Sequence, residues 1–134
     1  MSTWPDTRIL DLLGIEVPII QAPMAGATTT AMVIAAQQAG ALGSMPAAAL
    51  SLEQLRDALA LIRQASNAPL NVNFFCHQPP DGDEARDQAW KALLQPYYHE
   101  LGADFDAPTP VSNRAPFNDA ACQVVEAFRP EEVR

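Results

Sequence analysis

Basic residues are scarce in this chain. Lysine and arginine account for only 8 of its 134 residues, against 16 aspartates and glutamates, which gives a formal net charge of −8 at pH 7. Nucleic acids are bound by basic surfaces, and anionic membrane surfaces attract basic rather than acidic segments. The charge balance therefore argues against a nucleic-acid partner and against a membrane-surface partner.

Long apolar runs and cysteine clusters are also missing. No apolar stretch reaches the ~18 residues of a membrane-spanning helix, and Met1–Asp6 lacks the basic and apolar blocks of a signal peptide. The two cysteines, Cys76 and Cys122, lie far apart and without metal-ligand spacing, which is typical of a reduced cytoplasmic chain. We therefore expect a soluble, acidic, cytoplasmic protein without a metal site.

What the sequence does contain is an alternation of strand-like and helix-like segments. β-Strands are expected over Pro18–Gln21, Ala41–Ser44 and Leu70–Phe75, and residues 130–134 resemble the lead-in to another strand. Helices separate these strands, and three β-then-α units at this spacing favour parallel pairing with right-handed crossovers. The predicted fold class is therefore α/β.

Several polar residues stand where a helix start needs a cap. Helices are expected over residues 6–13, after a cap at Thr29 or Thr30, after the Ser51–Gln54 capping box, and after a cap at Asn118 or Asp119. Each of these side chains can accept a hydrogen bond from an unpaired N–H group of the first helical turn.

Residues 76–118 differ in character from the first half of the chain. After a turn-rich polar loop, a helix with a broad apolar side is expected over Glu84–Leu101, and Pro96 should kink or divide it. Residues 102–116 are rich in proline and poor in large apolar side chains, which predicts an extended, irregular loop.

Four ordered blocks of sequence resemble one known family. Residues 12–26, Leu-Leu-Gly-Ile-Glu-Val-Pro-Ile-Ile-Gln-Ala-Pro-Met-Ala-Gly, look like the opening of the nitronate monooxygenases, formerly called 2-nitropropane dioxygenases. Further matches follow at residues 39–44, 52–55 and 69–75, and the resemblance becomes vague after Phe75. The resemblance implies an FMN-dependent enzyme built on a (β/α)8 barrel of the TIM type.

The length of the chain limits how much of such a barrel it contains. A complete (β/α)8 barrel needs about 250 residues, whereas this chain has 134. By resemblance, residues 1–134 are a single N-terminal segment holding the first three βα units, with residues 76–118 as a less family-like insertion of a helix and a proline-rich loop.

The loop after the first expected strand is the main candidate site. Ligands of α/β sheets bind at the loops that follow the strands, although Ala22, Pro23 and Met24 could equally form only a rigid turn. By resemblance, a main-chain N–H of this loop binds the flavin edge. The resemblance also assigns an FMN contact to Asn73, with Asn71, one layer deeper on the same face, as the fallback.

Other reactive side chains are interpreted as structural or solvated. His77 follows the third strand, but the family places its catalytic histidine later in the chain, so that role is not transferred, and His99 lies at the end of a helix. Cys76 points away from His77 on an extended segment, the acidic residues of 81–84 suit a solvated helix start, and Thr28–Thr30 suit capping rather than phosphate binding. No catalytic residue is therefore assigned within residues 1–134.

The resemblance implies the oxidation of alkyl nitronates with oxygen, in which the cofactor carries the redox chemistry. Two alternatives stay open. Flavin-dependent enoyl-acyl carrier protein reductases share the architecture but typically carry Gly-Gly-Met where this chain has Ala22-Pro23-Met24, and the chain could also be a truncated, non-catalytic product. The sequence does not indicate which nitronate is used or the oligomeric state.

Overall fold

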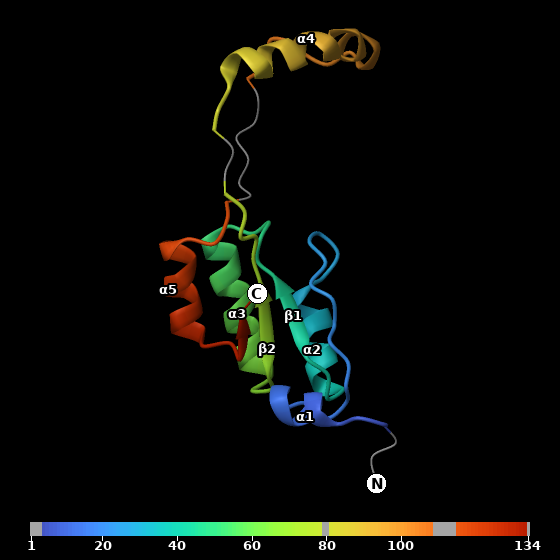
Figure 1. Cartoon of the computed structure of the whole chain (residues 1–134), viewed down its shortest axis with the longest axis vertical. Helices are drawn as coiled ribbons and strands as arrows, with labels where there is room; N and C mark the ends of the chain where they lie inside the picture. Colours follow the sequence, from blue (N-terminus) through green and yellow to red (C-terminus); the bar gives the residue numbers. More distant parts are fainter. Residues whose placement is uncertain (1–3, 79–80, 109–114, 134) are drawn as a thin grey trace. The chain divides into compact units, whose positions relative to one another are not determined.

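The computed structural model describes residues 4–78, 81–108 and 115–133. The chain divides into two compact units (Figure 1): residues 1–77 with 113–134 form the larger unit, and residues 78–112 form the smaller unit. In the described ranges, no helix combines the length and the apolar character needed to cross a membrane.

The larger unit is built on a parallel sheet. Its strands are β1 (Gly43–Pro46), β2 (Leu70–Asn73) and β3 (Glu132–Val133), in the order β1-β2-β3. Gly43 pairs with Leu70 at the start of β1 and β2, and both neighbouring pairs are parallel. The expectation of an α/β fold with parallel strands in chain order is therefore confirmed.

The first expected strand is much shorter than predicted. Within Pro18–Gln21 only one parallel bridge forms, between Ile20 and Leu42, with hydrogen bonds from Gln21 N–H to Leu42 O at 2.9 Å and from Leu42 N–H to Ile19 O at 3.0 Å. The next N–H that a parallel ladder would use belongs to residue 23, which is a proline and has none. The ladder therefore ends after Gln21.

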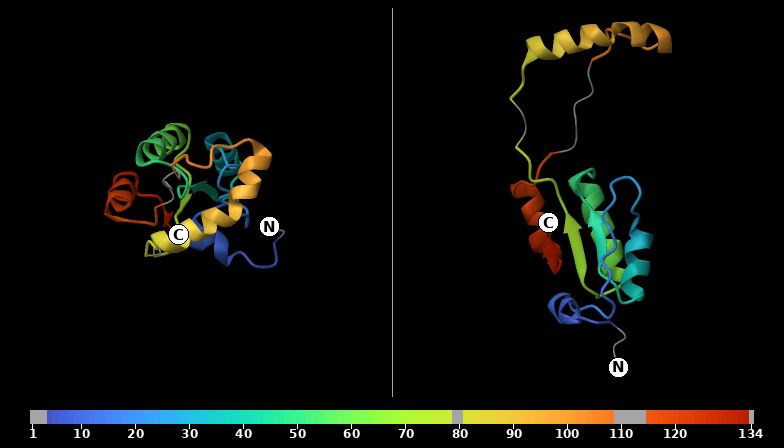
Figure 2. Two further views of the ribbon diagram at one scale, coloured as in Figure 1. Left: turned by 90° about the horizontal axis from the view of Figure 1, so that it is seen from above. Right: turned by 45° about the vertical axis from the view of Figure 1, so that its right-hand side comes forward.

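Helices cover one face of this sheet (Figures 1 and 2). They are α2 (Thr30–Gln38), α3 (Leu52–Ala65) and α5 (Asp119–Phe128), while the short α1 (Arg8–Leu13) lies near the edge where the strands begin. The core between helices and sheet is formed by Val33, Met45, Ala47, Leu55, Ala58, Leu59, Ile62, Leu70, Val72 and Val124. Burying each large side chain of this set stabilises the fold by about 1.5–3 kcal/mol.

The expected helix caps are present. The Thr29 hydroxyl accepts a hydrogen bond from the Met32 N–H, Ser51 and Gln54 form the reciprocal capping box, and the Asn118 side chain accepts from the Ala121 N–H. These local signals placed three helix starts correctly because a cap needs only residues close in sequence.

The smaller unit is a single helix with a returning segment. Helix α4 (Glu84–Leu101) begins at the Asp83 cap and runs through Pro96 as one element, so Pro96 does not divide it, and the expected kink stays a prediction. The segment after the helix folds back: the Phe105 ring meets Tyr98 edge-on at 5.4 Å, and Lys91 Nζ lies 5.1 Å from its centroid.

The apolar side of α4 exists but is not buried. No residue of the helix is buried, and Trp90, Leu93, Tyr97 and Leu101 are 59–80% exposed.

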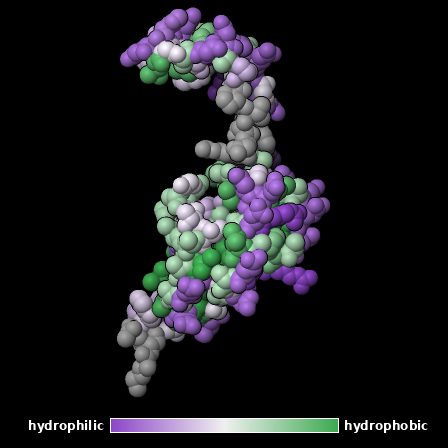
Figure 3. All heavy atoms as spheres, turned by 180° about the vertical axis from the view of Figure 1, so that it is seen from behind, coloured by the Kyte–Doolittle hydropathy of each residue, from purple (hydrophilic) through white to green (hydrophobic). Residues whose placement is uncertain are grey.

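Residues 102–108 and 115–116 contain no helix or strand, as expected, while residues 109–114 of the predicted loop lie outside the described residues. On the larger unit, hydrophobic residues (green in Figure 3) reach the surface among hydrophilic ones.

Glu131, in the segment before β3, is hydrogen-bonded to two elements of the larger unit, α3 and β2. Its Oε2 atom accepts hydrogen bonds from Arg63 Nη2 in α3 and from the Leu70 N–H in β2, both at 2.9 Å. Partial burial raises the pKa of the Glu131 carboxyl, but the hydrogen bonds from Arg63 and Leu70 outweigh it and hold the pKa below its usual value. A folded pKa below the unfolded one gives stability that is present above the unfolded pKa and lost as the pH falls through the folded pKa.

The variant Glu131→Gln is expected to lower the free energy of unfolding by about 1 kcal/mol at pH 7, a value kept small because the pair is partly exposed. Below the folded pKa the wild-type carboxyl is protonated as well, so the difference should vanish. Urea unfolding at neutral and acidic pH measures both values. Asp6→Asn is the matched control, because Asp6 also pairs with an arginine, Arg8, but at the exposed surface. An equal loss at both pH values would contradict the charge-based explanation.

Candidate functional site

The loop of residues 22–28 leaves the sheet at its C-terminal edge. It begins where the ladder ends, and here a side chain continues the hydrogen bonding to β1. The Gln21 Oε1 atom accepts a hydrogen bond from the Ser44 N–H at 2.9 Å. The Gln21 carboxamide thus takes the place of a main-chain carbonyl beside β1, although Gln21 and Ser44 are 23 positions apart in the chain.

Thr28 closes this loop from its other end. Its Oγ1 accepts hydrogen bonds from the Met24 N–H at 3.0 Å and from Gln21 Nε2 at 3.2 Å, and it donates to the Ala22 carbonyl at 3.2 Å. Gln21 Nε2 also donates to the Ala22 carbonyl. The hydroxyl, which is buried, has its donor and both acceptor positions occupied, so the loop is held by a closed network.

The three loop residues assigned by resemblance lie in a tight turn. The Met24 N–H also donates to the Ala22 carbonyl at 3.0 Å, and its side chain is exposed. Gly26 has a φ of +80°, in the left-handed region that favours glycine. Pro23 has no N–H and that of Met24 is engaged within the loop. Ala22 is then the one residue of the three with an N–H that finds no acceptor among the described residues.

Asn73 is the last residue of β2 and pairs with Pro46. Its carbonyl accepts from the Ala47 N–H at 2.8 Å, and its side chain is half-buried. Because all strands run parallel, residues that follow Ile20 and residues at the end of β2 lie at the same, C-terminal edge of the sheet (Figure 1). The fold therefore places Met24 and Asn73 at one edge.

A polar pair lies one layer deeper on the sheet face turned away from the helices. Val72 faces the helical core, so its neighbours Asn71 and Asn73 face the other way. Asn71 and Ser44 are register partners, both are buried, and Asn71 Oδ1 and Ser44 Oγ have no hydrogen-bond partner in the described residues. Leaving such atoms unpaired costs about 1–3 kcal/mol each, which a polar ligand or water at this face would recover.

These features fit a flat, polar cofactor such as FMN at the C-terminal edge. The loop offers the Ala22 N–H and the apolar Met24 side chain, β2 offers the Asn73 amide, and Ser44 and Asn71 supply unpaired polar atoms below them. An arrangement of few polar groups on an otherwise apolar scaffold is typical of cofactor sites. The unpaired Ser44 hydroxyl and the hydrogen bonds of Gln21 and Thr28 were not predicted from the sequence, although Pro23 at a ladder position indicated that side chains would have to replace backbone hydrogen bonds.

The other candidates do not gather into a site. Cys76 and His77 are exposed, and the His77 ring lies 5.8 Å from that of Phe75. Thr29 is used as a helix cap. Within residues 4–78, 81–108 and 115–133, no group of three His, Cys, Asp or Glu side chains could hold a metal ion.

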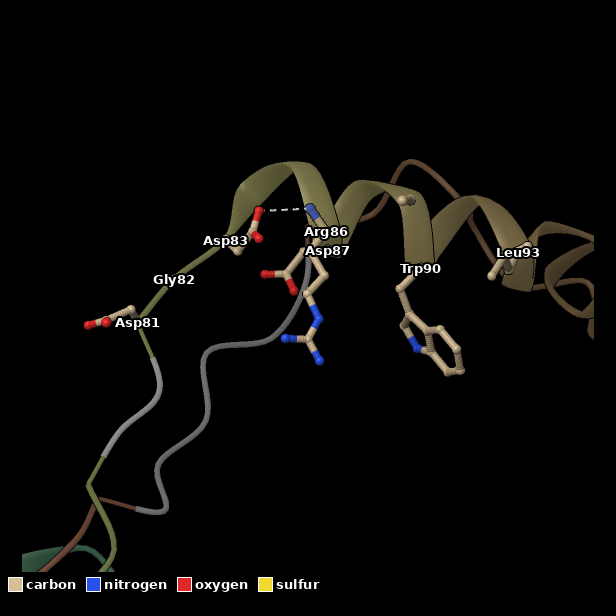
Figure 4. A pocket seen from close by; sticks show the side chains of 8 residues that line it. Asp81, Gly82, Asp83, Arg86, Asp87, Trp90 and Leu93 are labelled. Atoms are coloured by element: carbon tan, nitrogen blue, oxygen red, sulfur yellow. Dashed lines mark hydrogen bonds between the residues drawn. The ribbon is translucent and has the colours of Figure 1, made fainter.

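A hollow of about 690 Å³ lies in the smaller unit, along the first turns of α4 (Figure 4). Asp81, Asp83, Arg86, Asp87 and Trp90 contribute to its lining. The Asp83 carboxylate accepts from the Arg86 N–H at 2.9 Å and caps the helix, as expected for a solvated helix start. In Figure 4 the labelled side chains come from one helix and the segment before it, and they do not converge on a common point.

Comparison with known proteins gives consistent matches. Residues 6–112 match the family model described as "Nitronate monooxygenase". The nitronate monooxygenase of Pseudomonas aeruginosa is 43% identical over 97 residues, which are 72% of this chain and 28% of that protein. The one of Paraburkholderia phytofirmans is 42% identical over 95 residues, 71% of this chain and 26% of that protein. The chain thus spans little more than a quarter of the length of these relatives.

Two solved structures share the fold. A nitroalkane oxidase from Streptomyces ansochromogenes superposes with a TM-score of 0.67 at 24% identity, covering 87% of this chain and 32% of that chain. FabK from Thermotoga maritima superposes with a TM-score of 0.51 at 27% identity, covering 94% of this chain and 42% of that chain. At 24% identity, the superposition on the nitroalkane oxidase supports the fold alone. This chain corresponds to only part of that larger structure.

Proposed function

Because the chain belongs to the nitronate monooxygenase family, we propose that residues 1–134 supply one wall of the FMN site in an enzyme that oxidises alkyl nitronates with oxygen. The segment would be the first three βα units of a (β/α)8 barrel, with residues 76–118 as an insertion. The observation that supports the proposal is that the 22–28 loop and Asn73 both follow parallel strands at the C-terminal edge of one sheet.

In this proposal each assigned residue has a distinct task. The Ala22 N–H donates a hydrogen bond to a polar atom of the flavin ring, and Pro23 restricts the loop backbone around it. Met24 supplies an adaptable apolar surface for the ring. The Asn73 amide donates and accepts at the polar side of the cofactor. When bound, FMN supplies the electron-transfer chemistry.

We assign no proton-transfer residue to this segment. The wall formed by the loop and the end of β2 would bind and orient the flavin and exclude water from one side of it. We further propose that the enzyme acts in the cytoplasm without a nucleic-acid or membrane partner, in keeping with the net charge of −8 and the two free cysteines. The protein's substrates would then be a small nitronate and oxygen.

The test uses a joined chain, in which residues 1–134 are continued by the remaining part of the Pseudomonas aeruginosa relative. We expect this joined chain to bind FMN and to consume oxygen when an alkyl nitronate is added. Reduction of an enoyl thioester by a nicotinamide cofactor instead would favour the enoyl-acyl carrier protein reductases, and neither activity would overturn the proposal.

The variant Asn73→Ala tests the site within the joined chain. Removing a buried polar partner costs about 1–3 kcal/mol, so the Kd for FMN should rise by roughly 5–150-fold. Fluorescence titration with FMN measures the change. Asn67→Ala is the matched control, because Asn67 is exposed and precedes β2 at the opposite edge of the sheet. Equal affinities for wild type and Asn73→Ala would remove Asn73 from the site.

A further inference from the structure

The 22–28 loop is held by side chains rather than by a regular backbone ladder. Pro23 cannot donate, so the bridge at Ile20 is not extended. In its place Gln21 bonds to the Ser44 N–H on β1 with its oxygen, and to Thr28 Oγ1 and the Ala22 carbonyl with its nitrogen. A single carboxamide thereby connects the strand, the turn and the segment before α2.

We propose that Gln21 and Thr28 are positioning residues for the flavin, which together latch the 22–28 loop at a fixed height above Ser44 and Asn71. The inference rests on the proposed function and goes beyond it, because neither side chain is among the residues assigned to touch FMN. The latch orients the one free donor of the assigned loop residues, the Ala22 N–H, by holding the Ala22 carbonyl and the Met24 N–H that follow it in the chain.

Backbone hydrogen bonds from the Ala27 and Thr28 N–H groups to the Met24 carbonyl shape the turn, and the Thr28 hydroxyl adds the contacts that tie it to Ala22 and Gln21. Without the Thr28 hydroxyl, the Ala22 carbonyl loses one donor and the Met24 N–H loses one acceptor. The residues around Gly26 are exposed and offer no packing in exchange. A loop that is ordered before the cofactor binds has a higher affinity for it, because binding then does not include the free-energy cost of ordering the loop. Releasing the latch should therefore weaken FMN binding without removing a cofactor contact.

The first experiment compares three threonine variants in the joined chain. Thr28→Val keeps the shape of the side chain but removes the hydroxyl, and we expect the Kd for FMN to rise about 10-fold or more, with a shift of the visible flavin bands. Thr28→Ser keeps the hydroxyl and should restore both. Thr29→Val is the matched control, because the Thr29 hydroxyl caps α2 by accepting from the Met32 N–H and forms no hydrogen bond with the described residues of the loop. It should lower the Tm and leave the flavin spectrum unchanged.

The second experiment follows the loop itself. In Gln21→Glu the carboxylate can still accept from the Ser44 N–H but cannot donate to Thr28 or Ala22, so the flavin affinity should fall as in Thr28→Val. Amide hydrogen exchange at Met24, measured by NMR in residues 1–134 without flavin, should be faster in Thr28→Val than in wild type or Thr28→Ser.

The outcomes separate the latch from the function. If wild type binds FMN and Thr28→Val binds it equally well with the same spectrum, the latch proposal is overturned while the proposed function stands. If Thr28→Ser is as impaired as Thr28→Val, the hydroxyl is not the cause and the proposal is again overturned. If the unsubstituted joined chain fails to bind FMN while the Pseudomonas aeruginosa relative binds it, the proposed function is overturned.

Discussion

Residues 1–134 expressed alone are expected to elute colourless from gel filtration after incubation with FMN, whereas the joined chain elutes yellow. The three parallel strands and one bridge of the described residues cannot close a barrel that needs eight strands. At one side of the sheet, Ile19 and Ile20 are about half exposed, with relative exposures of 51% and 49%. The phosphate of a barrel-bound cofactor is also commonly held by the loops after strands seven and eight.

Absorbance in the visible flavin region, divided by protein absorbance, measures the retained fraction. We expect it to be near zero for residues 1–134 and near one flavin per chain for the joined chain. The unmodified Pseudomonas aeruginosa relative, carried through the same column, controls for loss of flavin during the run. A yellow 134-residue chain that oxidises nitronates would overturn the view that this segment forms only one wall of the site.

Gly43→Ala is expected to reduce the free energy of unfolding of the larger unit by about 3 kcal/mol, near the upper end of overpacking effects. A Cβ at Gly43 would lie 2.7 Å from the Val33 carbonyl oxygen and 2.8 Å from Val33 Cγ1. The nearest atom belongs to the backbone of α2, so the clash is relieved only if the helix moves away from β1. Such a movement would open the core around Val33, which is fully buried.

Urea unfolding followed by circular dichroism measures this loss. Gly82→Ala is the matched control, because a Cβ at Gly82 meets no atom within 4 Å, and we expect no measurable change. If Gly43→Ala unfolds at the same urea concentration as wild type, the close approach of α2 to β1 does not limit the fold.

The helix starts and the parallel order of the strands could be predicted from the sequence because they depend on near neighbours. Thr29, Ser51 and Asn118 cap helices whose first N–H groups lie two or three residues away. Alternation of strand-like and helix-like segments was enough to indicate parallel pairing. The family was likewise recognisable from short ordered blocks, and the comparisons confirm it.

Other features depended on contacts between residues far apart in the chain. The first strand was expected over four residues because Ile19 and Ile20 favour strands locally, whereas only Ile20 forms a bridge, to Leu42. The spacing of apolar residues correctly predicted helix α4 and its apolar side. The same spacing does not indicate what that side packs against, and in the structure it is exposed.

The candidate site shows the same division. Its position was predicted from the sequence alone, because Pro23 and Gly26 end a strand and ligands of a parallel fold bind after the strands. Only the tertiary structure decided which side chains hold the loop, since Gln21 meets Ser44 across 23 positions and Ser44 meets Asn71 across two strands. Hydrogen bonds over such separations depend on the register and twist of a packed sheet, and neither quantity is contained in local propensity or spacing.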